Sequence, residues 1–248
     1  MVDCQAKRFD EKKTTLPRSK QTPVSTGTRE ALILAGERLF AEHGINGVSL
    51  RQINTVAGQK NSSAAHYHFG SKQALIKAIH SYRLESVNQR RHAWLEKLHV
   101  DGKQGDVRAI VETIVHPIVE EIHETEGGSY YIRFLAQVVG HPKIDVSELW
   151  SKRIASGLTE VLNLLKAANP EVAETLMGQR FGLMWEQTIH ALSDWEQLRG
   201  LSSGGEAADL VVFVSNLVDM IAGGLSAPVS DTTRREIDAH QQHRDSQG

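Results

Sequence analysis

The chain has 248 residues, of which 40% are hydrophobic and 23% charged, with a formal net charge of −2 at pH 7. This composition is that of a globular protein and excludes wholesale disorder and fibrous structure. The lone cysteine, Cys4, excludes a disulfide framework and a cysteine-based zinc site, and fits a reducing cytosol. The sequence shows no targeting segment and no apolar run long enough for a membrane span. We therefore expect a cytoplasmic protein without membrane contact, and no residue pattern predicts a metal or another cofactor.

Charge is distributed unevenly along the chain. Residues 1–100 contain 16 Lys and Arg against 8 Asp and Glu, whereas residues 101–248 contain 12 against 22. Such asymmetry indicates a basic half that meets a polyanion, although residues 1–25 supply much of the excess. That stretch is polar and contains two prolines, so we expect a disordered basic arm.

After this arm the hydrophobic periodicity is helical almost everywhere, and no stretch shows the sustained alternation of a strand. Gly44 is expected to end the first helix, and Ser49, with a glutamine three residues on, has the form of a capping box. Asn61 or Ser62 is expected to cap a third helix and Ser71 a fourth. The predicted ranges are 28–43, 50–57, 61–68, 72–98, 106–125, 129–140, 145–168, 170–197 and 205–223.

The sequence therefore predicts an all-α protein. Three short helices near the start form a helix-turn-helix unit, a weak signal when taken by itself. We expect this unit to be a DNA-binding domain, because the major groove admits a helix whose first residues reach base edges. The expected domains are a basic arm at 1–25, this unit at 26–74, a larger helical effector-binding and dimerisation domain at 75–228, and a flexible tail at 229–248.

The last predicted helix is apolar on nearly every side. A helix of this kind is buried all round, and its second face could meet another subunit. Paired with the preceding helix, it would form an isologous four-helix interface in a homodimer. The alternative is an internal core helix. The residues expected at the interface are Leu210, Phe213, Val214, Leu217, Val218 and Ile221.

Residue types within 28–75 carry a more specific signal. The motif consists of Leu39-Phe40-Ala41-Glu42-His43-Gly44, then Ser49 with Ile53, Ala57-Gly58, and Tyr67-His68-Phe69-Gly70-Ser71-Lys72 with Leu75. Over about one fifth of the chain this order and spacing resembles the N-terminal domain of the TetR family of bacterial transcriptional repressors. The chain departs from the family at Gln59-Lys60-Asn61 and is one residue longer between Gly58 and Phe69. The register of the base-reading residues is therefore open by one position.

The resemblance implies roles for individual residues. Tyr67 and Lys72 match positions that contact DNA phosphates, and a hydroxyl and an ammonium group are both suitable donors. Alternatives are core packing for the tyrosine and simple exposure for the lysine. The other residues expected to contact DNA are Ser49 and Arg51 at the backbone, Gln59 and Asn61 at a base, and Ser62, Ser63, Ala64 and His66 along the reading helix.

The resemblance also implies a small-molecule effector, apolar or acidic, bound among the later helices. The expected function is a dimeric repressor on a palindromic operator in double-stranded DNA, released when the effector changes the separation of the two reading units. Pocket candidates are the polar or aromatic residues of otherwise apolar helices: His116, Tyr130, Tyr131, Arg133, Phe134, Trp150, Trp185 and His190. For each of them, core packing or surface exposure is the alternative.

A helical enzyme, or a protein-interaction bundle with a head that only resembles a DNA-binding unit, is the competing hypothesis. The sequence lacks a dinucleotide fingerprint, a phosphate-binding loop and a nucleophile elbow. We therefore expect no catalytic residues.

Overall fold

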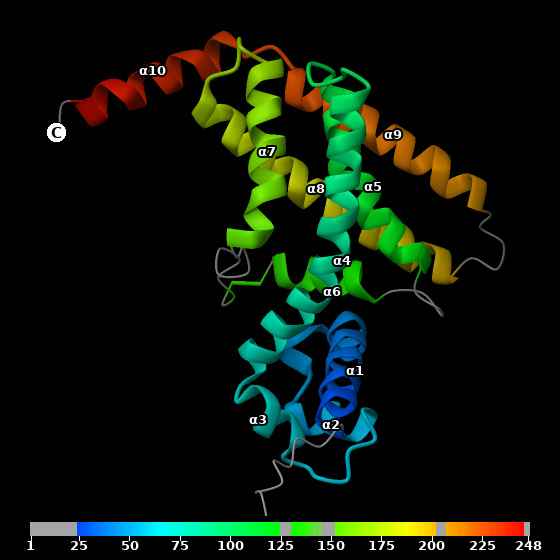
Figure 1. The fold of residues 1–248 in the computed structure, drawn as a ribbon. Helices are drawn as coiled ribbons and strands as arrows, with labels where there is room; N and C mark the ends of the chain where they lie inside the picture. The colour runs from blue at the N-terminus through cyan, green and yellow to red at the C-terminus, as the bar shows by residue number, and fades with distance from the viewer. Residues whose placement is uncertain are drawn as a thin grey trace, which may run out of the picture.

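The computed structural model describes residues 24–124, 130–139, 141–142, 144, 152–201 and 207–245. Every regular element among them is an α-helix, so the predicted all-α class is confirmed. Figure 1 shows a small head, formed by α1–α3, joined by the long helix α4 to a body formed by the later helices. The helices are α1 (Val24–Gly47), α2 (Leu50–Val56), α3 (Ala64–Phe69), α4 (Lys72–Val100), α5 (Val107–Glu124), α6 (Tyr131–Val139), α7 (Lys152–Ala168), α8 (Glu174–Leu201), α9 (Ala207–Ser226) and α10 (Asp231–Asp245).

Local sequence signals delimit the helices of the head. Gly44 leaves the helical conformation at φ 72°, so the first helix breaks there as predicted, although one more turn follows. The capping box of α2 is present, because Ser49 Oγ accepts from Gln52 N at 3.3 Å while Gln52 Oε1 accepts from Ser49 N at 2.8 Å. Ser71 caps α4 by accepting from Ala74 N at 3.1 Å. The caps predicted for these two helices are confirmed.

The third helix begins later than predicted. It starts at Ala64 rather than at residue 61, and its N-cap residue, Ser63, makes no side-chain capping bond. Asn61 Oδ1 instead accepts from Ser63 N at 2.9 Å. Asparagine offers the backbone a local alternative to the helical hydrogen bond, and here it extends the turn.

The head has its own hydrophobic core, continuous with that of the body. Leu32 and Phe40 of α1, Ile53 of α2, Ala65 of α3 and Leu75 of α4 are all fully buried. The first turns of α4 thus pack on the head, while the rest of the helix packs against α5 and α7. Helix α4 is therefore part of both units.

A buried ionic cluster also ties the head to the body. Arg83 of α4 donates from Nε and Nη2 to the two oxygens of Glu37 of α1, at 2.7 and 3.0 Å. Its Nη1 donates at 3.0 Å to Glu121 of α5, which also accepts from Arg90 at 2.6 Å. Burial lowers the pKa of Arg83, but the hydrogen bond and charge of Glu37, followed by Glu121, raise it to a net value above normal. This cluster of charged side chains thus joins α1, α4 and α5.

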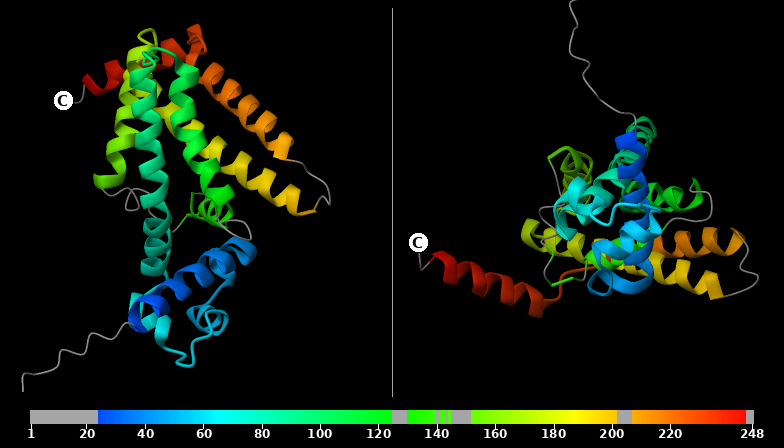
Figure 2. Two further views of the ribbon diagram at one scale, coloured as in Figure 1. Left: turned by 45° about the vertical axis from the view of Figure 1, so that its right-hand side comes forward. Right: turned by 90° about the horizontal axis from the view of Figure 1, so that it is seen from below.

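In the body, α8 and α9 lie side by side, and α9 also packs on α5 (Figure 2). Helix α6 lies between α1 and α8. The end of the chain differs from the expectation, because α10 is a helix where a flexible tail was predicted. Ser230 accepts from Thr233 N at 3.2 Å at its start, a local cap that the polar composition of the tail concealed.

The residues that the structure describes contain neither a membrane-spanning helix nor a metal-binding cluster. No single helix is long and apolar enough to cross a membrane, and only the bent pair 210–226 and 231–239 reaches that length and composition jointly. Nowhere in the same residues do three His, Cys, Asp or Glu side chains form a group that could hold a metal ion.

Candidate nucleic-acid interface

The orientation of α3 on the head is set by a buried asparagine of α2. Asn54 is almost completely buried, and its Oδ1 accepts from Ala65 N at 2.8 Å while its Nδ2 donates to the carbonyl of Ser62. The Asn54 side chain thus pairs with the amide of Ala65 and the carbonyl of Ser62, on either side of the start of α3. Asn54 was not among the predicted site residues. Its polar type on the apolar side of α2 was the only available signal.

The turn before α3 is closed by its own polar residues. Gly58 adopts φ 66°, a conformation that favours glycine, and Gln59 N donates to Asn54 O at 2.9 Å. The side chain of Gln59 donates to Ala57 O at 3.0 Å, and that of Asn61 accepts from Ser63 N. Both side chains predicted to bond a base therefore bond the turn in this structure.

Helix α3 and the turn before it present a polar, exposed surface. Ser62, Ser63 and His66 are exposed, and Tyr67 is 85% exposed. Because they are adjacent at the start of a helix on the surface of the head, they form the part of this unit best placed to enter a groove. These four predicted residues lie together.

Ala64 is the exception among the residues of the reading helix. Its side chain is buried in the core of the head, as is that of Ala65. A buried methyl group is not available to a base edge, so the assignment of Ala64 as a DNA contact is wrong. The later start of α3 accounts for the error, since it turns residues 64 and 65 inward.

Tyr67 and Lys72 lie on either side of the junction between α3 and α4. Because its ring is exposed, the tyrosine is not packed in the core, and its edge contacts His68 at a centroid distance of 5.3 Å. Lys72 is half-buried, with Nζ 5.9 Å from the ring centroid of Phe40, and its partial burial lowers the pKa of its ammonium group. Its position at the first residue of α4 places a cation beside free backbone donors.

The backbone-contact candidates lie at the start of α2. Ser49 is exposed but engaged in the capping box, and Arg51 is exposed. Residues 24–79, which comprise the head and the first turns of α4, contain six Lys or Arg and three Glu, so this region is basic even without the arm. This charge favours a polyanion.

The predicted effector residues that the structure describes are spread over buried, half-buried and exposed positions. Tyr131 and Phe134 are buried and stack together, whereas His190 is exposed on α8, which contradicts its assignment to an interior site. Trp185 is half-buried, and Trp150 lies outside the described residues. The residue types of the predicted effector set did not show which helix faces pack together. The remaining three, His116, Tyr130 and Arg133, are half-buried.

These three residues make their own local contacts. His116 stacks on Trp94 at 4.5 Å, and burial lowers the pKa of its ring. The guanidinium of Arg133 lies over Tyr130 at 4.9 Å, and its Nε is 3.7 Å from Glu196, whose pKa burial raises to about 7. Arg133 thus already faces a carboxyl group.

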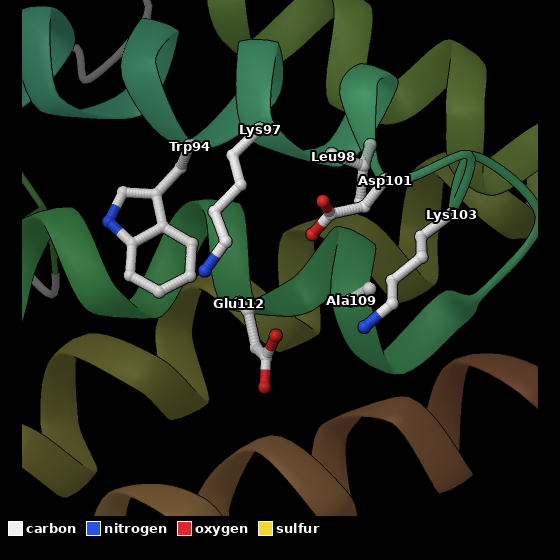
Figure 3. A pocket seen from close by; sticks show the side chains of 7 residues that line it. All are labelled: Trp94, Lys97, Leu98, Asp101, Lys103, Ala109 and Glu112. Carbon is white, nitrogen blue, oxygen red and sulfur yellow. The ribbon is translucent and has the colours of Figure 1, made fainter.

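A hollow between α4 and α5 is drawn in Figure 3. It is lined by Trp94, Lys97, Leu98, Asp101, Lys103, Ala109 and Glu112, and its volume is about 40 Å³. Sites for small organic ligands are typically larger and mainly apolar, with volumes of roughly 300–1,000 Å³. Four of the seven lining side chains are charged, so the hollow does not resemble an effector site.

The predicted dimer contacts on α9 need correction. Leu210, Val214, Leu217, Val218 and Ile221 are all buried within the chain itself. The sixth residue, Phe213, is half-buried and stacks on Trp195 of α8 at 6.1 Å. These side chains form the internal core, the alternative considered from the sequence, and are not available to a second subunit. Because α9 is apolar on most sides, its composition did not distinguish the inner face from the outer one.

Other apolar side chains of α8 and α9 are exposed. Val211 and Val212 are each 70% exposed, and Met220 and Leu183 are also largely exposed. A groove of about 210 Å³ runs between the two helices and is lined by Arg180, Leu183, Met184, Gln187, Ile221, Gly224 and Leu225. Apolar side chains on two adjacent helices therefore remain open to another surface.

Two family models match the chain. Residues 32–79 match the bacterial regulatory proteins of the tetR family, and residues 112–224 match the tetracyclin repressor-like C-terminal domain. The first match covers the head and the second most of the body. No curated protein sequence matches the chain.

Solved structures agree with the fold. A tetR family transcription regulator from Shewanella sp. PV-4 aligns at a TM-score of 0.57 with 16% identity, covering 79% of this chain and 96% of the other. The transcriptional regulator FadR from Bacillus subtilis, solved in complex with stearoyl-CoA, aligns at 0.50 with 13% identity, covering 79% and 98%. At these identities the likeness concerns the fold alone.

Proposed function

The chain belongs to the TetR family of bacterial regulatory proteins, and we propose that it is a homodimeric repressor released from a palindromic operator by a small-molecule effector. As a family member it is a DNA-binding transcription regulator. The dimer, the repression and the effector are the proposed parts. The proposal places the protein in the cytoplasm, with its DNA, and gives it no catalytic step.

The observation that carries the proposal is the exposed face of α3, held in place by Asn54. Ser62, Ser63, His66 and Tyr67 are open to a groove, while Lys72 stands at the adjacent helix start. We assign the four exposed residues to base or backbone contacts and Lys72 to a phosphate. Arg51 and the capped start of α2 would contact the backbone on the other side.

The exposed apolar side chains of α8 and α9 support the dimer. A second copy of the chain would cover Val211, Val212, Met220 and Leu183 on both subunits, because a two-fold interface uses the same patch twice. It would also place two heads on one DNA molecule. A dimer with two-fold symmetry binds a palindromic operator whose half-sites are separated by whole turns of the duplex.

Helix α4 supports coupling between effector and DNA. It begins at Lys72 beside the reading helix and continues through the body to Val100, and the Glu37–Arg83–Glu121 cluster joins it to α1 and α5. An effector that binds more tightly to one position of α4 would change the separation of the heads. Its differential affinity for the two states sets the size of the effect.

Fluorescence anisotropy tests the DNA-binding part. Purified protein is titrated into the DNA that flanks its own gene and into scrambled DNA of equal length, at two salt concentrations. We expect tight binding to the flank and weak, salt-sensitive binding to the scramble. Equal binding to both at each salt concentration would contradict a sequence-specific contact by α3.

A further inference from the structure

An arginine lies in the core of the body, and no described residue supplies a counter-ion to it. Arg91 of α4 is 0% exposed, and its Nη1 donates to Asn88 Oδ1 at 2.6 Å. Its Nε and Nη2 are buried and have no hydrogen-bond partner, and the described residues supply no carboxylate to it. A buried cation is costly unless it is paired, so two free donors at this depth require an explanation.

The same helix shows what such an arginine normally holds. Arg83 lies eight residues earlier, and its Nε and Nη2 bind the two oxygens of the Glu37 carboxylate at 2.7 and 3.0 Å. These two nitrogens form one edge of the guanidinium group, and their N–H bonds match both oxygens of a carboxylate. No described residue binds the same edge of Arg91.

Apart from Asn88 and the nearby phenol of Tyr131, the described residues next to Arg91 along α4 and on α7 are apolar or glycine. Val87 and Leu95, one turn away on either side along α4, are buried, and so is Leu158 of α7. Gly157 lets the arginine lie close against α7, since a Cβ built there would be 3.2 Å from Arg91 Cδ. Burial lowers the pKa of Arg91 to about 10, so the group keeps its charge at neutral pH.

We propose that the free edge of Arg91 anchors the carboxylate of an otherwise apolar organic acid bound within the body between α4 and α7. This inference rests on the proposed function, because it assigns a chemical class to the effector. Arg133, the arginine expected from the sequence to hold an acid, is a poorer anchor because Glu196 already lies beside it.

The first test needs no ligand. In the apoprotein an unpaired buried charge destabilises the fold, so Arg91→Met should raise the melting temperature, by about 2–4 °C for each kcal/mol recovered. The matched control is Arg83→Met, which removes an arginine already bound to the Glu37 carboxylate. This substitution should lower the melting temperature. If Arg91→Met lowers the melting temperature as much as Arg83→Met does, the chain itself supplies the anion, which overturns the proposal.

The second test uses paired probes. Decanoate and 3-phenylpropionate are compared with 1-decanol, 3-phenylpropanol and decyl phosphate by calorimetric titration of the full-length wild-type protein and Arg91→Met. We expect at least one acid to bind the wild type about tenfold or more tightly than its alcohol, and to lose that advantage in the variant. Binding of neither acid, equal affinity of an acid for both proteins, or a preference for decyl phosphate would each overturn the carboxylate assignment.

The same acids are then added to the DNA complex, which separates the two proposals. An acid that binds through Arg91 but leaves DNA affinity unchanged supports the anion site and contradicts release by effector. An acid that releases DNA equally from the wild type and from Arg91→Met supports release and overturns the role of Arg91.

Discussion

The buried contact between the head and the body has a measurable energy. In Glu37→Gln the side chain keeps its shape but loses the charge that binds both Nε and Nη2 of Arg83. Both partners are largely buried, with side-chain exposures of 2% and 12%, so solvent screens the pair weakly. Removing one partner of a buried pair typically costs about 3–5 kcal/mol. Because Glu121 still binds Arg83, we expect the lower end, about 3 kcal/mol.

Urea unfolding followed by circular dichroism measures this loss. In a thermal scan, a loss of about 3 kcal/mol lowers the melting temperature by about 6–12 °C for a chain of this size. The matched control is Glu42→Gln, on the same helix, whose carboxylate pairs with an exposed Arg38 at 3.1 Å. Solvent screens an exposed pair of this kind, so it contributes little to stability and the control should remain close to the wild type. If the two variants lose equal stability, the cluster does not hold the head to the body as we argue.

Three further predictions concern DNA, assembly and pH. Lys72→Ala should weaken binding to all DNA sequences alike and lower the salt slope by about one ion, so anisotropy showing full-strength binding would contradict the phosphate contact. Val212→Asp should yield a folded monomer by light scattering, whereas Val100→Asp, a control at an exposed valine outside the interface, should stay dimeric; a dimer in both would remove α9 from the interface. His80 is buried against Tyr131 with its pKa lowered from 6.5 to about 4, so its contribution to stability is lost as pH falls from 6.5 to 4. Between pH 7 and pH 5 the free energy of unfolding, measured with urea, should therefore fall by about 2 kcal/mol less in His80→Phe than in the wild type. Parallel pH profiles of the two proteins would contradict this.

Some parts of the protein followed from the sequence because they depend on neighbours along the chain. The caps at Ser49 and Ser71 and the helix break at Gly44 involve residues within three or four positions, so their residue types were sufficient. The hydrophobic period predicted helices for the same reason. Even here Asn61 shows the limit, since it extended a turn where a helix start was expected.

The candidate site was only partly predictable. Exposed Ser62, Ser63 and Tyr67 were identified by their place in the motif, whereas Ala64 proved to be buried. Asn54 was missed because its partners lie 8 and 11 residues further along the chain. Its role exists only once α2 and α3 are packed.

Burial across the body was decided by tertiary structure. The period of α9 showed that it is apolar but not that Val214 points inward and Val212 outward, because both faces carry apolar residues. The unpaired edge of Arg91 is invisible in sequence, where it resembles Arg83 two turns earlier. Local interactions are encoded by adjacent residues, so the sequence alone determined the helices and the head motif. Whether a charge finds a partner depends on which distant segments pack around it, and only the folded chain decided that.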